Sequence, residues 1–289
     1  MKKSGPLKLY DFIRKGKTRK NTWKIAWGLL FLSLGLPACT LYSPGTASQA
    51  VVKGCVVPSD QQGTFSGKWP LTPIPVALSQ GEFNSSETTA ITAAMDTWNT
   101  FYTASSGLTQ VFHYGSSSSS PNTSSVTDSS QSSYPCESGI VGNNQFIGNV
   151  VVYKLYTWPS SYAPSAMAQT SYCFQTASPF NRIYLAVIEI NYQNFFVNNN
   201  KVPDLQSIIT HEFGHLLGLG HSCEMTQKTG FPNCLESNLN PDYLAAIMFP
   251  TFSFDQNGNG IQKRSLGNDD EGRANCLYQG SGTTASPTP

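Results

Sequence analysis

The sequence lacks, after its basic N-terminus, a hydrophobic run long enough to cross a bilayer comfortably. Residues 1–24 contain nine Lys or Arg residues and one acidic residue, Asp11, and an uncharged apolar run of only twelve residues, IAWGLLFLSLGL (25–36), follows. A membrane-spanning helix needs about 20 such residues. The run instead fits the hydrophobic region of a secretory signal. We therefore expect residues 1–38 to be a signal peptide.

The segment LPAC (36–39) resembles a bacterial lipobox, with Cys39 as the lipidated residue. This resemblance implies an exported lipoprotein of the bacterial cell envelope, on the outer surface or in the periplasm, attached to the membrane through a lipid at Cys39. A soluble secreted product and an uncleaved anchor are the two alternatives. Residues 39–68 are polar and contain glycine, and we expect a short lipid-anchored spacer there.

Little positive charge remains beyond the signal. The whole chain has 18 Lys or Arg and 17 Asp or Glu residues, a formal net charge of +1. Removal of residues 1–38 leaves nine basic and 16 acidic residues, a net charge of −7. Because no basic patch remains, we expect no nucleic-acid partner.

Histidine is also scarce, yet three of the four histidines fall in HEFGHLLGLGH (211–221). Residues four apart share a helix face, so His211 and His215 can direct their imidazoles at one point. Gly218 suits a helix stop, and the turn there brings His221 toward the other two. Three neutral imidazoles with an open fourth position are typical of a catalytic zinc site.

The residues before the motif favour an amphipathic helix. VPDLQSIIT (202–210) places apolar residues at helical spacing after Pro203 and Asp204, which suit a helix start. On such a helix Glu212 points about 100° away from the first ligand, where it can hydrogen-bond a water molecule rather than the metal. Zinc lowers the pKa of bound water to about 7, and a carboxylate there can pass the proton to a leaving amine. This is the chemistry of peptide hydrolysis.

The motif resembles the zinc signature of the metzincin metallopeptidases. That family adds a downstream methionine in a tight turn beneath the metal, and AAIMFP (245–250) supplies Met248. The chain resembles the matrixins most closely, because Ser222 follows the third histidine and Pro250 stands where astacins and serralysins carry a tyrosine. The resemblance implies a zinc endopeptidase with no fifth protein ligand.

The resemblance also implies a fold, namely a mixed α/β (α+β) domain with a five-stranded sheet, an active-site helix, the methionine turn and a C-terminal helix. We expect this zinc peptidase domain to span residues 69–280. The segments that resemble family elements are a first strand (68–79), a first helix (85–101), a strand before the active-site helix (181–191) and a closing helix (266–278).

Four further segments complete the expected organisation. Residues 150–158 are rich in β-branched and aromatic residues and favour a strand. By family position, residues 165–172 are the candidate edge strand that pairs with an extended substrate, and an ordinary loop is the alternative. Residues 115–133 are a Ser-rich surface loop, and residues 281–289 a disordered tail.

The cysteines other than Cys39 number six, an even count that suggests up to three disulfides with 15 possible connectivities. A Cys223–Cys234 bridge is favoured, because it closes the loop that leaves the third ligand. The alternative of Cys223 as a zinc ligand is not needed, since three histidines already match the open site. The six candidate disulfide cysteines are Cys55, Cys136, Cys173, Cys223, Cys234 and Cys276.

The matrixin prodomain motif Pro-Arg-Cys-Gly, which blocks the zinc, does not occur. Cys55 is the upstream candidate for such a switch besides Cys39, and a disulfide is the simpler account in an oxidising compartment.

DQNGNG (255–260) resembles the start of a calcium loop, but Leu266 stands where the bidentate Glu belongs. This excludes a complete EF-hand and leaves a glycine-rich turn as the alternative.

Three residues outside these motifs receive structural interpretations. His113 follows a short apolar run and is expected at a strand end. Trp98 and Phe101 lie at helical spacing and are expected in the core.

We therefore predict a secreted or lipid-anchored zinc-dependent endopeptidase that acts on proteins or peptides. His211, His215 and His221 bind zinc, Glu212 is the general base, and Met248 forms a hydrophobic floor. The rival hypothesis is a catalytically inactive zinc-containing surface protein that binds a partner through the Ser-rich loop. The presence of Glu212 argues against it, because a structural site needs no such carboxylate. An exported toxin or adhesin with incidental proteolysis is a third hypothesis.

Overall fold

The computed structural model describes residues 51–52, 54–79, 81–114, 123–124, 150–196 and 201–278. The expected signal peptide, Cys39, Cys136 and the tail at 281–289 lie outside these residues, as does most of the Ser-rich segment. Within the described residues, no helix combines the length and the apolar character needed to cross a membrane.

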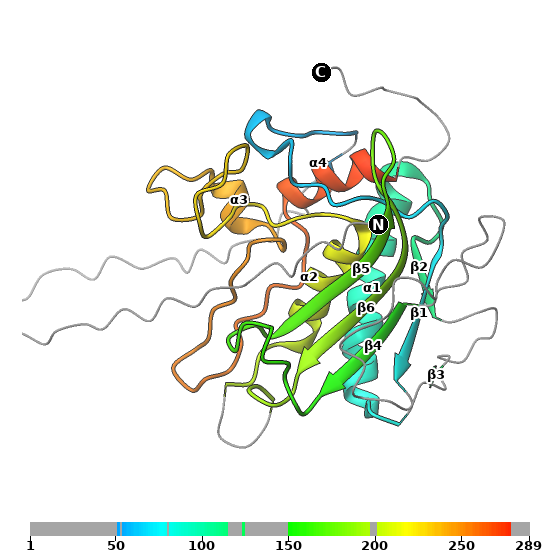
Figure 1. Cartoon of the computed structure of the whole chain (residues 1–289), viewed down its shortest axis with the longest axis vertical. Coiled ribbons are helices and arrows are strands. Elements are labelled where there is room, and N and C mark those ends of the chain that lie inside the picture. The colour runs from blue at the N-terminus through cyan, green and yellow to red at the C-terminus, as the bar shows by residue number, and fades with distance from the viewer. Residues whose placement is uncertain are drawn as a thin grey trace, which may run out of the picture. The chain divides into compact units, whose positions relative to one another are not determined.

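A twisted mixed sheet forms one layer of the described domain (Figure 1). Its continuous strand order is β2-β1-β4-β6-β5, and all neighbours are parallel except β5 and β6. This confirms the expected mixed α/β fold with five strands, to which a two-residue strand, β3, adds by pairing with the end of β1. The strands are β1 (Ile74–Ser79), β2 (Phe112–Tyr114), β3 (Thr123–Ser124), β4 (Val150–Leu155), β5 (Ala168–Gln175) and β6 (Arg182–Asn191).

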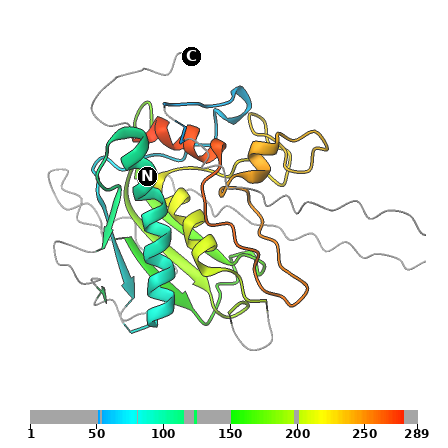
Figure 2. The ribbon, with the colours of Figure 1, turned by 180° about the vertical axis from the view of Figure 1, so that it is seen from behind.

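Two long helices, α1 (Ser85–Ser106) and α2 (Leu205–Leu217), cover the same face of the sheet (Figure 2). Each begins at a polar side chain that satisfies a free backbone N–H. Asn84 and Glu87 form a reciprocal capping box at the start of α1, and Asp204 accepts a hydrogen bond from the backbone N–H of Ser207 at the start of α2. The predicted helix start at Asp204 is confirmed.

The main hydrophobic core lies between the sheet and these helices. Trp98 and Phe101 of α1 are buried in it, as predicted. The indole of Trp98 donates a hydrogen bond of 2.9 Å to the carbonyl oxygen of Thr210, which joins α1 to the helix that carries the histidine motif. Phe213 of the same helix stacks on Phe112 of β2 with 4.9 Å between ring centroids. Helix α2 is therefore held by a hydrogen bond from α1 and by aromatic packing against β2.

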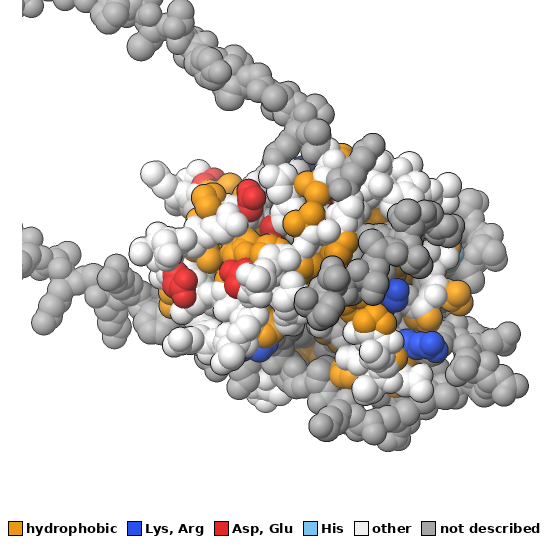
Figure 3. Space-filling model, turned by 90° about the horizontal axis from the view of Figure 1, so that it is seen from above, with side chains coloured by type: hydrophobic (Ala, Val, Ile, Leu, Met, Phe, Trp, Pro, Cys, Tyr) orange, Lys and Arg blue, Asp and Glu red, His pale blue; other side chains and the backbone are white. Residues whose placement is uncertain are grey.

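The C-terminal part of the domain contains a short helix, α3 (Pro241–Ala245), and the closing helix, α4 (Asn268–Leu277). Both lie near one end of the strands in Figure 1. Viewed from that end, the described surface on the α3 side mixes hydrophobic and acidic side chains (Figure 3).

The described part of the expected spacer, residues 51–68, packs on the domain. The backbone N–H of Val56 donates to the carbonyl of Gly272 at 3.0 Å, and the N–H of Lys68 donates to the carbonyl of Asn181 at 2.8 Å. A short 3₁₀ helix, Ser59–Gln61, lies between these contacts. The described residues between 51 and 68 therefore contact the domain that was expected to begin at residue 69.

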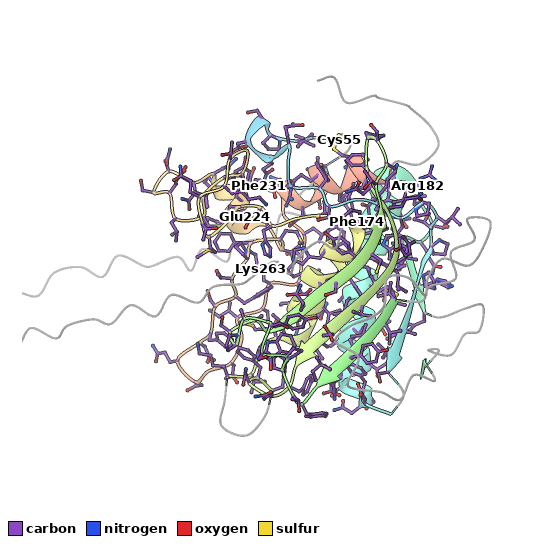
Figure 4. The ribbon with its side chains drawn as sticks, viewed as in Figure 1. Cys55, Phe174, Arg182, Glu224, Phe231 and Lys263 are labelled. Atoms are coloured by element: carbon purple, nitrogen blue, oxygen red, sulfur yellow. A yellow bond between two sulfur atoms is a disulfide. The ribbon has the colours of Figure 1, made fainter. Side chains whose placement is uncertain are left out.

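Two disulfides join described cysteines. Cys223–Cys234 is confirmed, and Cys55–Cys276 ties the N-terminal segment to α4, beside which Cys55 lies in Figure 4. Cys173 is also disulfide-bonded. Since Cys55 and Cys223 are both oxidised, neither the switch role of Cys55 nor zinc ligation by Cys223 fits the structure.

Candidate metal centre and active site

Helix α2 and the turn that follows it bring the three motif histidines together. The Nε2 atoms of His211 and His215 are 3.0 Å apart, and those of His215 and His221 are 3.2 Å apart. Gly218 ends the helix with φ of 107°, and a Cβ atom there would lie 1.8 Å from the carbonyl oxygen of Gly67. Only glycine combines that backbone conformation with so close an approach.

The hydrogen bonds of the first two histidines set which nitrogen faces the centre. Nδ1 of His211 lies 2.7 Å from the carbonyl oxygen of Ile247, and Nδ1 of His215 lies 2.8 Å from that of Leu219. A carbonyl oxygen can only accept, so both Nδ1 atoms carry the proton when the rings are neutral. Their Nε2 lone pairs then converge on one point, an arrangement that a bound cation would stabilise.

The donor set fits zinc. Bonds of about 2.0–2.1 Å from one ion at near-tetrahedral angles place ligand nitrogens roughly 3.3 Å apart, close to the 3.0 Å and 3.2 Å observed. The three residues are the one group of three or more His, Cys, Asp or Glu side chains in the described ranges whose ligand atoms could hold a metal ion. Backbone carbonyls that orient ligating imidazoles are also a common feature of metal sites.

Burial keeps the imidazoles neutral. It lowers the pKa of His211 and of His221 well below the usual range, and the neighbouring His215 lowers both further. Burial also lowers the pKa of His215 to about 4, against a smaller opposite effect of the hydrogen bond to Leu219. Neutral imidazole is the form that binds metal ions.

Met248 lies in a buried turn that is fixed by a carboxylate on α4. The Asp270 side chain accepts hydrogen bonds from the backbone N–H groups of Ile247 at 2.6 Å and Met248 at 3.0 Å. The carbonyl of Met248 in turn accepts the N–H of Ser222 at 2.9 Å, next to the third histidine. Asp270 therefore supports both the turn and the first ligand, since Ile247 also holds His211. Sequence reasoning missed Asp270, although its place in the acidic first turn of α4 was a possible signal.

The loop that carries His221 is held by the N-terminal segment and by α4. The backbone N–H of Gly220 donates to the carbonyl of Thr64 at 2.6 Å, and Gln61 Nε2 donates to the carbonyl of Ser222 at 2.7 Å. From α4, Arg273 Nη1 donates to the carbonyl of Gly220 at 2.9 Å. These bonds flank the third histidine on both sides, which restricts its backbone in the absence of any regular secondary structure.

Glu212 is almost completely buried beside the histidines. Its Oε2 accepts a hydrogen bond of 2.6 Å from the hydroxyl of Thr170 on β5, a partner that sequence reasoning did not find. Burial raises the pKa of the carboxyl to about 7, while the two interactions with Thr170 lower it. Such a value suits a group that takes and returns a proton near neutral pH.

The histidines and Glu212 open into a cleft beside the edge strand β5. The edge strand was predicted at residues 165–172, and the structure forms it over Ala168–Gln175, three residues later. Side chains that line the cleft with the site residues include Met167, Ala168, Ile208, Pro250 and Phe252. The cleft therefore joins polar reactive groups, an apolar wall and a strand that lies at the edge of the sheet formed by the described residues.

The remaining candidates do not enter the site. Asp255 accepts hydrogen bonds of 2.8 Å from the backbone N–H groups of Asn257 and Asn259, which is the pattern of a tight turn and gives no support to calcium. His113 lies within the short strand β2 rather than among the other histidines.

No protein-family model matches the chain, and no curated protein matches its sequence. Solved structures are similar to the chain. Among them is high choriolytic enzyme 1, a hatching enzyme zinc-protease from Oryzias latipes (Medaka fish), with a TM-score of 0.34, 16% sequence identity, and coverage of 78% of this chain and 98% of that chain. A likeness of this extent carries no argument about chemistry, so the function below rests on the geometry of the site.

Proposed function

We propose that the chain is a zinc-dependent endopeptidase. The observation that carries this proposal is the convergence of three imidazole nitrogens within 4.8 Å of one another, in one cleft with a buried glutamate. A purely structural zinc site is closed by four protein ligands, whereas three ligands leave a position open. The side chains of His211, His215 and His221 would hold the metal.

The residues of the cleft then have distinct roles. When bound, zinc supplies Lewis-acid chemistry, which polarises a carbonyl oxygen and makes water nucleophilic near neutral pH. Glu212 removes the proton from the attacking water and delivers it to the nitrogen of the leaving amine. Met248, fully buried beneath α2, closes the floor of the site. Strand β5, which lies at the edge of the sheet formed by the described residues, offers main-chain hydrogen bonds to an extended peptide.

The finer assignments belong to the same proposal. A matrixin-like subtype is supported by Pro250, which lines the cleft two places after Met248 and supplies no ligand atom.

Export, with lipid attachment at Cys39, is supported by the basic and apolar N-terminal segments and by the disulfides. If Cys39 carries the lipid, Cys39→Ala will move the protein from the detergent phase to the soluble secreted fraction, and an unchanged membrane fraction with an intact N-terminus contradicts lipidation.

The test of the peptidase proposal compares Glu212→Gln with the matched exposed substitution Glu236→Gln. Glu212→Gln should retain zinc through the three histidines and lose activity on a broad peptide library by a factor of about 10² to 10⁴. Glu236→Gln should keep both zinc and activity. His215→Ala should lose both, because two ligands hold zinc poorly. Wild-type protein that contains zinc and cleaves no peptide would refute the proposal, as would full activity in Glu212→Gln.

A further inference from the structure

The hydrogen bond between Thr170 and Glu212 joins two different elements across the cleft. Thr170 belongs to the edge strand β5, and Glu212 to helix α2. The hydroxyl of Thr170 lies 2.6 Å from Glu212 Oε2 and 3.4 Å from the carbonyl oxygen of the same residue. It has one proton to donate, and the shorter distance assigns that proton to the carboxylate. A separation of this length is typical of a hydroxyl bound to a charged carboxylate.

The carboxylate interacts with Thr170 in two ways. Its Oε2 accepts the bond from the hydroxyl, and the backbone N–H of Thr170 also interacts with the carboxyl group. A glutamate side chain has three rotatable bonds and loses considerable entropy when confined to one conformation. The two interactions with one residue restrict the orientation of the group, and the side-chain hydroxyl supplies the part that a substitution can remove.

The position of the hydroxyl is itself fixed by the sheet. Thr170 is paired with Ile188 of β6 in an antiparallel register that is regular from Ala168 to Cys173. Its β-branched side chain has few accessible χ1 conformations. The residue is 7% exposed, so water does not readily replace the hydroxyl as a donor. An apolar side chain at this place would remove the hydroxyl donor from a buried carboxylate.

We propose that Thr170 is a positioning residue of the active site, which acts by holding the Glu212 carboxylate in the orientation that proton transfer requires. The inference rests on the proposed peptidase function, because it assigns Thr170 a task within that reaction. Thr170 does not touch the reacting atoms in this role. Its hydroxyl restrains the carboxylate that handles the proton.

The variants that test this inference are Thr170→Val, which replaces the hydroxyl by a methyl group of similar size, and Thr170→Ser, which keeps the hydroxyl. Thr92→Val is the matched control, because it removes a threonine hydroxyl bonded to Tyr114 of β2, which lies at the opposite end of the strand order from β5. For each zinc-loaded protein, zinc content, kcat and KM are measured with one peptide substrate. Crystal structures of the wild type and of Thr170→Val give the orientation of the Glu212 side chain.

We expect Thr170→Val to keep its zinc and its KM while kcat falls about tenfold to a hundredfold, the effect of a misplaced catalytic group. Thr170→Ser should recover most of the lost kcat, and Thr92→Val should lose none. In the crystal structure of Thr170→Val, the Glu212 carboxylate should leave its wild-type position. A double variant tests the positioning role specifically. In the Glu212→Gln background, Thr170→Val should cause no further loss of kcat, because the effects of residues that act through one another are not additive.

The outcomes separate the inference from the proposed function. If the wild type is active and Thr170→Val retains its kcat, or if Thr170→Val lowers activity equally in the Glu212→Gln background, the positioning role is wrong and the peptidase function stands. Failure of Thr170→Ser to recover activity also contradicts it. If the zinc-loaded wild type cleaves nothing, the peptidase function fails, and an unchanged Glu212 orientation in Thr170→Val then refutes the inference independently.

Discussion

The sulfur atom of Met248 lies directly against the backbone of Gly214 in the middle of helix α2. A Cβ atom added to Gly214 would be 2.2 Å from Met248 Sδ and 3.2 Å from the ring of Trp98. Glycine in a helix interior is normally unfavourable by about 1 kcal/mol relative to alanine. Here its absence of a side chain lets the methionine turn approach the helix between the two metal-site histidines His211 and His215.

Gly214→Ala should therefore destabilise the protein although it improves helix propensity. Overpacking of a filled site costs about 1–3 kcal/mol, which exceeds the propensity gain, and urea unfolding should show a net loss. In the background Met248→Ala, which empties the site, the same substitution should become neutral or stabilising. Equal effects of Gly214→Ala in the two backgrounds would show that the methionine is not the obstacle.

Removal of the metal should lower the thermal stability of the wild type. A ligand that binds only the folded state stabilises it by about 4 kcal/mol when its free concentration is 1,000 times Kd. Calorimetry should therefore show a lower Tm after treatment with a chelator and recovery on addition of zinc. The variant His215→Ala is the control, and its Tm should not respond to either treatment. A chelator response in that variant would mean that another site binds the metal.

Glu189 should make the stability fall as the pH rises from acidic to neutral. This residue of β6 is 1% exposed, and burial raises the pKa of its carboxyl from the usual 4.5 to about 7, although a hydrogen bond from Tyr162 lowers it. Between these two values the folded state holds a proton that the unfolded state has lost. The stabilisation is therefore fully present below pH 4.5 and is lost as the pH rises through about 7.

Glu189→Gln removes this titration and keeps an acceptor for Tyr162. At pH 8 we expect the variant to be more stable than the wild type by about 3 kcal/mol, and at pH 4 the difference should vanish. Urea unfolding measured across this pH range is the test. Parallel pH profiles of the two proteins would contradict the prediction, and the exposed substitution Glu236→Gln should leave the profile unchanged.

Removal of the disulfides Cys223–Cys234 and Cys55–Cys276 should affect stability and zinc binding to different extents. The Cys223–Cys234 bridge closes a short loop, with a sequence separation of 11, and begins two residues after His221. Its replacement by two alanines should cost about 3 kcal/mol by the chain-entropy account and should weaken zinc binding. Removal of Cys55–Cys276, with a separation of 221, should cost more stability, about 5 kcal/mol by the same account, with a smaller effect on zinc. Competitive zinc titration and urea unfolding of both double variants are the tests. The prediction is contradicted if loss of Cys223–Cys234 weakens zinc binding no more than loss of Cys55–Cys276 does.

Local signals in the sequence were sufficient to predict the elements that contain the candidate metal ligands. The start of α2 at Asp204, its end at Gly218 and the approach of His221 all follow from side-chain spacing and from glycine stereochemistry. The short Cys223–Cys234 bridge was predictable for the same reason, because its two cysteines are close in the chain.

Partners that are distant in the sequence could not be predicted in this way. The bond of Thr170 to Glu212 spans 42 residues, and that of Gln61 to Ser222 spans 161. Each depends on the packing of two elements whose relative position no local pattern specifies. The predicted edge strand began three residues before the observed one. The limits of the strand depend on its register with β6 rather than on its own composition.

The path of residues 51–68 has a mechanical consequence. Cys55 is bonded to Cys276 of α4 before the chain reaches Gln61 and Thr64, which support the loop of the third histidine. A pull on the chain ahead of Val51 is therefore transmitted through a covalent bond to the closing helix. Gln61 and Thr64 follow Cys55 in the chain, so a tether at the N-terminal side pulls first on the disulfide and on α4 rather than directly on the segment that supports the third histidine.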